Sequence, residues 1–281
     1  MFTTLNAQKV PAIGMGTWML GNDPARKHDE LNALRSGLEA GLRLIDTAEM
    51  YGEGRSERLT GELISHYERE DLYLVSKVLP YHAGKETIFK ACDASLKRLQ
   101  SDYLDLYLLH WPGPVPMEET IFCMEELKSR GRIRDWGVSN FDADDMKALF
   151  ALDGGRLCKT NQVLYNIADR GIEYDLLPLM QAEKMPLMAY SPLAQAGVLN
   201  RSIYESPVLK KICRKHAITR EELMLAFLLS RDGVLPIPRS ASVQHTLENA
   251  AALEIRLDAE DLDAIDRVFP PPQEKTPLRV V

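Results

Sequence analysis

The fold is decided by the segment LDLYLLHWP, residues 104–112. Six of its first eight residues are aliphatic or aromatic, which is typical of a strand buried on both faces of a parallel sheet. The apolar run stops at His110, and Pro112 cannot donate a hydrogen bond to a neighbouring strand. We therefore predict a buried strand that presents an imidazole at its carboxyl end.

Other apolar runs also end on polar side chains. Residues 42–45 lead to Asp46, residues 72–76 lead to Lys77, and residues 136–138 lead to Ser139 and Asn140. Between such runs lie segments with helical spacing, for example residues 85–99, where Ile88, Cys92, Leu96 and Leu99 share one face. This alternation predicts parallel strands with right-handed crossovers, and therefore a (β/α)8 barrel with chemistry at one rim.

The expected elements follow from the same patterns. We expect a hairpin at residues 2–10 that turns near Asn6-Ala7 and plugs the barrel, and strands at residues 13–17, 42–46, 73–77, 104–109, 133–139, 160–164, 187–190 and 234–238. We expect helices at residues 29–40, from 56, at 85–99, 118–130, 142–152 (with Asp142 as N-cap), 174–183, 208–216, 221–230, 243–253 and, as an extra C-terminal helix, 258–268. Residues 191–207 read as a long polar connection over the barrel mouth.

Length and composition bound the class of protein. The chain has 281 residues, close to the roughly 250 of a typical barrel, and we see no linker, so residues 1–281 are expected to form one domain. A net charge of −7 argues against nucleic-acid binding, and no apolar run reaches the roughly 18 residues of a membrane span. Four scattered cysteines and an N-terminus without signal-peptide features predict a cytoplasmic protein. We expect a monomer without a metal.

Four polar residues are expected to meet at the rim, namely Asp46, Tyr51, Lys77 and His110. Lys77 would be costly to bury alone, and Asp46 one strand away is its natural counter-ion. A cation beside Tyr51 is expected to lower the phenol pKa from about 10 toward neutrality, which would make Tyr51 a general acid. His110 could donate to the same substrate oxygen.

Each of these residues taken singly is more often structural than catalytic, and other readings stay open. Lys77 could be the Schiff-base nucleophile of a barrel aldolase, although a neighbouring Asp46 argues against a neutral lysine. A metal hydrolase is weaker, because His-x-His and HExxH are absent. A non-enzymatic sensor or channel-associated subunit on the same fold is a further alternative.

Seven motifs, taken together, carry a resemblance to a known family. They are GMGTW (14–18), DTAEMYG (46–52), VSK (75–77), LLHWP (108–112), GVSNF (137–141), NQ (161–162) and AYSPL (189–193). In this order and spacing, from residue 14 to about residue 249, the chain resembles the aldo-keto reductase superfamily, and especially its short bacterial members that reduce 2-oxoaldehydes such as methylglyoxal. GxGxxG is absent, so a nicotinamide cofactor here would bind by the barrel route.

The resemblance implies a role for each matching position. Asp46, Tyr51, Lys77 and His110 would form a catalytic tetrad. Ser139, Asn140 and Gln162 would hold the nicotinamide carboxamide, with Tyr190 stacked on the ring, and Ser191, Leu193 and the following loop would line the pyrophosphate. Arg239, Ser240, His245, Glu248 and Asn249 would hold the adenosine-phosphate end, while Trp18 and Trp111 would wall the pocket of a small carbonyl substrate.

Two departures from the family pattern concern the cofactor. Arg239 stands where the family has lysine, and His245 where it has arginine. These departures concern the choice between NADPH and NADH. Because Arg239 keeps a charge and Ser240 keeps a hydroxyl for the 2′-phosphate, we expect NADPH as cofactor, with NADH as the alternative. The tail after Phe269 is short, which suggests that one wall of the pocket is open.

Overall fold

Eight parallel strands form the centre of the computed structural model, which describes residues 1–5, 8–194 and 198–280. In chain order they are β3 (Met15–Gly16), β4 (Leu44–Asp46), β5 (Tyr73–Val78), β6 (Leu104–Leu109), β7 (Ile133–Ser139), β8 (Asn161–Leu164), β9 (Leu187–Tyr190) and β10 (Val234–Pro236). Each of the strands β4 to β9 pairs with the strand before and the strand after it in the chain, and β3 and β10 are the two ends of this order. This is the parallel order that the sequence predicts.

The first and last strands close the barrel through backbone hydrogen bonds. Gly14 N donates to Pro236 O and Gly16 N to Pro238 O, both at 3.0 Å, and Gly16 forms a parallel bridge with Arg239. A Cβ atom on Gly16 would lie 2.9 Å from the carbonyl oxygen of Ile237, so only glycine permits this approach. The (β/α)8 barrel is therefore confirmed, with a short first strand at its seam.

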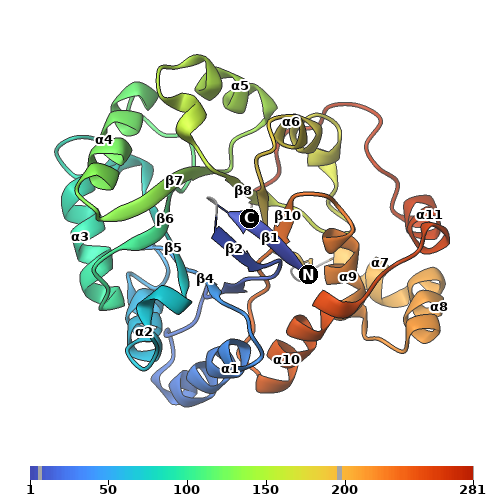
Figure 1. Cartoon of the computed structure of the whole chain (residues 1–281). Coiled ribbons are helices and arrows are strands. Elements are labelled where there is room, and N and C mark those ends of the chain that lie inside the picture. Colours follow the sequence, from blue (N-terminus) through green and yellow to red (C-terminus); the bar gives the residue numbers. More distant parts are fainter. Residues whose placement is uncertain (6–7, 195–197, 281) are drawn as a thin grey trace.

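The helices form the outer ring of the barrel (Figure 1). They are α1 (Lys27–Glu39), α2 (Arg55–Ile64), α3 (Ile88–Leu99), α4 (Met117–Ser129), α5 (Ala143–Ala151), α6 (Leu176–Ala182), α7 (Val198–Glu205), α8 (Pro207–His216), α9 (Arg220–Leu229), α10 (Val243–Ala251) and α11 (Ala259–Val268). Asp142 caps α5 with its side chain, as predicted, and completes a capping box with Asp145. Among the described residues, no helix is both long and apolar enough to span a membrane.

The expectation of a loop after β9 is wrong in part. Residues 191–207 were expected to be a polar loop, but α7 forms within them. Ile203 on this helix is fully buried, and the Tyr204 hydroxyl donates to Glu221 on α9 at 2.6 Å. Packing against neighbouring elements thus stabilises a helix whose polar composition suggests a loop.

The N-terminal hairpin closes the end of the barrel opposite to the carboxyl ends of the strands. Strands β1 (Phe2–Leu5) and β2 (Gln8–Pro11) pair antiparallel, and they lie across the centre of the barrel in Figure 1. Leu5 and Val10 pack with Tyr73 and Leu106 in the barrel interior. The predicted plug is therefore confirmed, while its turn at Asn6-Ala7 lies outside the described residues.

Candidate active site

A cavity of about 990 Å³ opens at the carboxyl ends of the strands. Its wall brings together residues from both ends of the chain: Gly16, Trp18, Met19, Arg26, Asp46, Met50, Tyr51, His110, Trp111, Pro112, Ser139, Asn140, Gln162, Tyr190, Ser191, Pro192, Leu193, Ala194, Ile237, Pro238, Arg239 and Val280. The structure thus gathers most of the predicted site residues in one place, which is where active sites of this fold lie.

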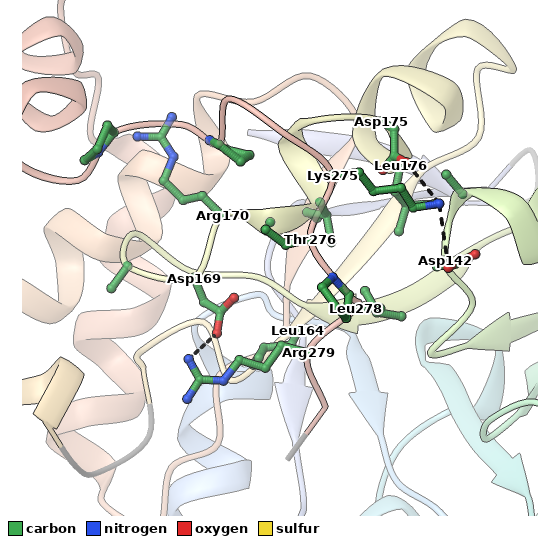
Figure 2. Close-up of a pocket in the computed structure, with 17 residues that line it drawn as sticks. Asp142, Leu164, Asp169, Arg170, Asp175, Leu176, Lys275, Thr276, Leu278 and Arg279 are labelled. Atoms are coloured by element: carbon green, nitrogen blue, oxygen red, sulfur yellow. Dashed lines mark ion pairs between the residues drawn. The ribbon is translucent and has the colours of Figure 1, made fainter.

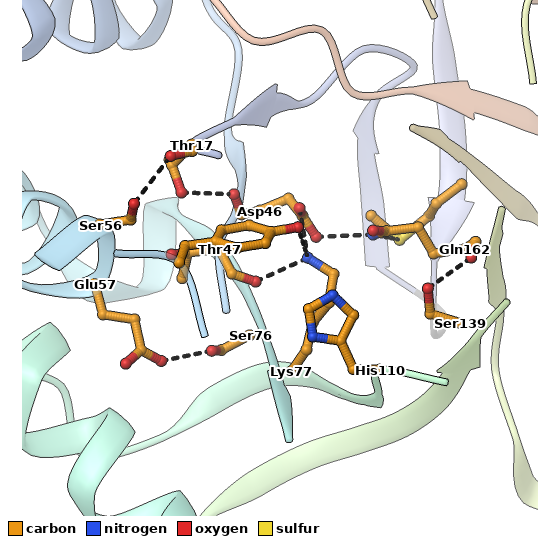
Figure 3. Close-up of polar contacts among 12 residues, drawn as sticks. Thr17, Asp46, Thr47, Ser56, Glu57, Ser76, Lys77, His110, Ser139 and Gln162 are labelled. Carbon is orange, nitrogen blue, oxygen red and sulfur yellow. Dashed lines mark hydrogen bonds and ion pairs between the residues drawn. The ribbon is translucent and has the colours of Figure 1, made fainter. Parts of the chain in front are cut away.

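A buried ion pair lies at the bottom of this cavity (Figure 3). The Lys77 side chain has no exposed surface, and its Nζ donates to Asp46 Oδ2 at 2.7 Å, to Thr47 O at 2.9 Å and to Tyr51 Oη at 3.1 Å. Burial alone lowers the pKa of Lys77, but the Asp46 carboxylate and Tyr51 raise it above its usual value. Lys77 is therefore an ammonium whose three hydrogens all have acceptors.

The turn between β4 and α2 delivers Tyr51 to this ammonium. Gly54 N donates to Tyr51 O at 3.2 Å, and Gly54 has a φ of 81°, a left-handed conformation that favours glycine. On the other side, Glu49 accepts from Leu79 N at 2.7 Å, which ties the turn to the end of β5. The position of the phenol is thus set by backbone contacts on both sides.

The expected lowering of the Tyr51 pKa is wrong in direction. The pKa of Tyr51 is raised, because the cost of burying a phenolate outweighs the attraction of Lys77, and the Asp46 carboxylate raises it further. The sequence identified the cation but could not weigh burial against it. Tyr51 consequently holds its proton at neutral pH, as a proton donor must.

His110 is neutral at this site. Burial and then the Lys77 charge lower the pKa of His110 to about 3. Its Nδ1 is buried and finds no hydrogen-bond partner in the part of the chain that the structure describes. The imidazole ring lies 5.8 Å from the Tyr51 ring and 4.8 Å from the Trp111 ring, measured between centroids. It can therefore donate one hydrogen bond without carrying charge.

Gln162 joins this group through a contact between residues that are 116 positions apart. Its Nε2 donates to Asp46 Oδ1 at 2.8 Å, so both carboxylate oxygens of Asp46 are engaged, one by Gln162 and one by Lys77 (Figure 3). Ser139 Oγ in turn donates to the backbone oxygen of Gln162 at 2.7 Å. The sequence motifs offered no signal of this link between β8 and β4.

Asn140 and Tyr190 extend the same hydrogen-bond network toward His110. Tyr190 Oη donates to Asn140 Oδ1 at 2.9 Å, and Asn140 Nδ2 donates to His110 O at 3.1 Å. Asn140 has a φ of 60° and Ser191 a φ of 49°, uncommon values for residues other than glycine. Backbone strain of this kind is held in place by surrounding contacts and gathers at functional sites.

The predicted adenosine-phosphate residues divide into two groups. Arg239 lines the cavity, whereas Ser240, His245, Glu248 and Asn249 do not. Ser240 Oγ donates to Ser242 O at 2.9 Å, which shapes the turn before α10. His245 is exposed in the first turn of α10. Arg26, which no motif singled out, lines the cavity instead.

Apolar side chains form the outer wall of the cavity. Trp18 is 41% exposed, Met19 52% and Met50 42%, so a hydrophobic ligand would find uncovered surface there. The two methionines were missed by the sequence analysis, because a single methionine after a strand carries no pattern. Trp18 and Trp111 line the cavity, as the resemblance implied.

The C-terminal tail lies along the rim, contrary to the expectation of an open wall. In Figure 2, Lys275 Nζ lies 3.5 Å from Asp175 and 3.9 Å from Asp142, while Arg279 pairs with Asp169 at 3.0 Å. Lys275 Nζ also lies 2.6 Å from Asp144. A second cavity of about 310 Å³ lies between the tail and the barrel. These ion pairs hold the tail so that Val280 reaches the wall of the main cavity.

The donor set of the main cavity fits a nicotinamide dinucleotide. Ser139, Asn140 and Gln162 offer hydroxyl and amide groups, Tyr190 offers an aromatic face, and Arg239 offers a cation at the other end. In the part of the chain that the structure describes, no group of three or more His, Cys, Asp or Glu residues could hold a metal ion.

Comparison with known proteins identifies the class. Residues 12–269 match the model of the aldo/keto reductase family. The chain belongs to this family, whose members are oxidoreductases that use a nicotinamide cofactor.

Individual relatives cover nearly the whole chain. The methylglyoxal reductase YeaE of Escherichia coli strain K12 is 49% identical over 272 residues, which are 97% of this chain and 95% of that protein. An aldo/keto reductase from Klebsiella pneumoniae in complex with NADP and acetate has a TM-score of 0.97, with 49% identity, 100% of this chain and 99% of that chain covered. An aldo-keto reductase from the same organism in complex with NADPH has a TM-score of 0.96, with 48% identity and 100% of both chains covered.

Proposed function

We propose that this protein reduces small activated carbonyl compounds, above all 2-oxoaldehydes such as methylglyoxal, to alcohols with NADPH. The observation that carries the proposal is the buried Asp46–Lys77–Tyr51 chain at the bottom of a cavity that also exposes Tyr190. The 49% identity to a methylglyoxal reductase supports the substrate class. NADH is the alternative cofactor.

Each polar residue of the cavity has a role in this proposal. Ser139, Asn140 and Gln162 hold the nicotinamide carboxamide and Tyr190 stacks on the ring, while Ser191, Leu193 and the following loop line the pyrophosphate; that loop lies partly outside the described residues. Arg239 binds the adenosine phosphate from the cavity wall, while Ser240, His245, Glu248 and Asn249, which do not line the cavity, belong to the turn and the helix α10 that follow Arg239. When bound, the cofactor supplies a hydride to the carbonyl carbon. Trp18 and Trp111 confine the substrate.

Proton transfer is the task of the chain itself. The substrate oxygen accepts hydrogen bonds from Tyr51 Oη and the neutral His110 ring, and it gains negative charge as the carbonyl is reduced. Tyr51 then gives its phenolic proton to that oxygen. Lys77, 3.1 Å from Oη, stabilises the phenolate that remains, and Asp46 keeps Lys77 charged. Solvent returns the proton to Tyr51.

We propose that residues 1–281 form one domain and that the protein is a cytoplasmic monomer without a nucleic-acid or membrane partner. Its four cysteines form no disulfide, which agrees with a reducing compartment. Light scattering at several concentrations tests the monomer, and a mass that rises with concentration would contradict it.

The aldolase alternative is disfavoured by the Lys77 contacts. A Schiff-base lysine must reach a neutral state, whereas Asp46 and Tyr51 raise the pKa of Lys77. Borohydride treatment in the presence of methylglyoxal should therefore leave the mass of Lys77 peptides unchanged; a reduced adduct there would favour the aldolase.

Steady-state oxidation of NADPH in the presence of methylglyoxal tests the proposed function directly. A panel with methylglyoxal, aromatic aldehydes and a steroid ketone should rank the steroid last in kcat/KM. Absence of turnover with every carbonyl, in a protein that still binds NADPH, would favour the sensor or channel-associated subunit instead.

A further inference from the structure

Two guanidinium groups line the main cavity without a protein partner. Arg239 follows β10, and Arg26 is the last residue of a short 3-10 helix, η1 (Pro24–Arg26), between β3 and α1. The bridge between Gly16 and Arg239 brings the end of β10 beside the end of β3. Within the described parts of the chain, neither Arg26 nor Arg239 has a side-chain hydrogen bond or an ion pair.

Arg26 and Arg239 are both exposed, and they are set apart by their place in the wall of the main cavity of an acidic protein. The chain has 41 acidic and 34 basic residues, so counter-ions are plentiful. Arginines that are more deeply buried are paired, for example Arg69 with Asp105 and Arg170 with Glu173, each at 2.6 Å. Among the described residues, the cavity wall therefore carries two positive charges that no carboxylate pairs with.

The two guanidinium groups also repel each other. Burial lowers the pKa of Arg239 and the charge of Arg26 lowers it further, with Glu30 acting in the opposite direction. The Glu30 carboxylate is engaged elsewhere, because it accepts from Gly21 N at 2.8 Å. Two like charges in one cavity lower the stability of the ligand-free protein, and a bound anion would remove that cost.

We propose that Arg26 and Arg239 together bind one phosphate group of the dinucleotide cofactor. This inference rests on the proposed function, and it adds Arg26, from the connection between β3 and α1, as the second cation of the phosphate site. Planar guanidinium groups bind phosphate through paired hydrogen bonds, which a histidine cannot match. Arg26 thereby supplies the second charge that His245, outside the cavity wall, does not bring to it.

Ligand binding, measured without turnover, tests the phosphate site. Dissociation constants for NADPH, NADH and 2′,5′-ADP are determined by calorimetry for the wild type, Arg26→Ala, Arg239→Ala and the double variant. Arg26→Ala should weaken NADPH binding about tenfold or more, which corresponds to roughly 1.4 kcal/mol. Because both cations act on one phosphate, the double variant should lose less than the product of the two single losses.

The pattern across ligands identifies the phosphate. Loss confined to NADPH and 2′,5′-ADP assigns the 2′-phosphate, whereas an equal loss with NADH assigns the pyrophosphate; either result supports the site. Lys27→Ala is the matched control, because Lys27 is the next residue and pairs with Glu62 outside the cavity wall. It should change no dissociation constant.

Three results would overturn the proposal. They are affinities of Arg26→Ala within twofold of the wild type for all three ligands, single losses that multiply in the double variant, or an equal loss in Lys27→Ala. The thermal midpoint of the ligand-free Arg26→Ala protein should not fall, because the substitution removes a repulsion. Binding of 2′,5′-ADP remains a test of the phosphate site even if no carbonyl is reduced, so the two proposals can fail separately.

Discussion

Within the described part of the chain, charged side chains are paired at one end of the main cavity and unpaired at the other. At the bottom, Lys77 and Asp46 are buried and every hydrogen of the ammonium has an acceptor. At the rim, Arg26 and Arg239 face the cavity with no partner among the described residues. The first arrangement is complete before a ligand arrives, which is what preorganised acid catalysis requires. The second is incomplete until an anion binds, which is what recognition of a cofactor requires.

Removal of the Tyr51 hydroxyl should have the largest effect, because it should impair catalysis at the bottom of the cavity and leave cofactor binding at the rim intact. Tyr51→Phe should lower kcat by about 10²–10⁴ because the proton donor is lost, while the dissociation constant of NADPH stays nearly unchanged. Tyr174→Phe, at a tyrosine that is 48% exposed, is the control and should keep full activity. More than half of the wild-type kcat in Tyr51→Phe, with the fold intact, would remove Tyr51 from the mechanism.

Breaking the buried Asp46–Lys77 pair should lower the free energy of unfolding more than breaking an exposed ion pair does. Asp46→Asn leaves an uncompensated ammonium and should lower the free energy of unfolding by about 3–5 kcal/mol. Glu62→Gln breaks an ion pair whose side chains are 48% and 44% exposed, and it should cost at most about 1 kcal/mol. Urea unfolding of both variants measures these free energies. Equal decreases in the two variants would show that the buried pair stabilises the fold no more than the exposed pair.

The neutral His110 predicts a pH dependence of stability. Its folded pKa of about 3 lies below the usual value of 6.5, so the unfolded chain takes up this proton first as pH falls. Stability is present above the unfolded pKa and is lost between pH 6.5 and pH 3, with about 2 kcal/mol of the loss between pH 7 and pH 5. His110→Gln should flatten this part of the profile in urea unfolding. Parallel profiles for the two proteins would show that His110 is not held neutral.

The smallest effect is expected at the open end of the cavity. His245→Arg adds a permanent charge to an exposed position outside the cavity wall, and it should tighten NADPH by at most about 1 kcal/mol without changing NADH. The gain should disappear in high salt. Calorimetric titration at two salt concentrations measures it, and a gain that survives high salt would place His245 inside the phosphate site.

The barrel fold could be predicted from the sequence, and so could the meeting of polar residues at the carboxyl ends of its strands. Both follow from local sequence patterns. The buried run of β6 ends before His110, Asp142 caps α5, and motif spacing identified Tyr51 and Lys77. Periodicity and capping depend on residues a few positions apart, so a sequence displays them directly.

Tertiary structure alone decided the properties that depend on distant neighbours. The pKa of Tyr51 rises because burial outweighs one cation, and burial is a property of the packed barrel. Gln162 reaches Asp46, and Arg26 faces the same cavity as Arg239, only after the barrel closes. The ion pairs of Lys275 likewise bring Val280 to the cavity wall. Which groups meet, and how much water they lose, is set by the fold as a whole, because these energies arise between residues that no local pattern connects.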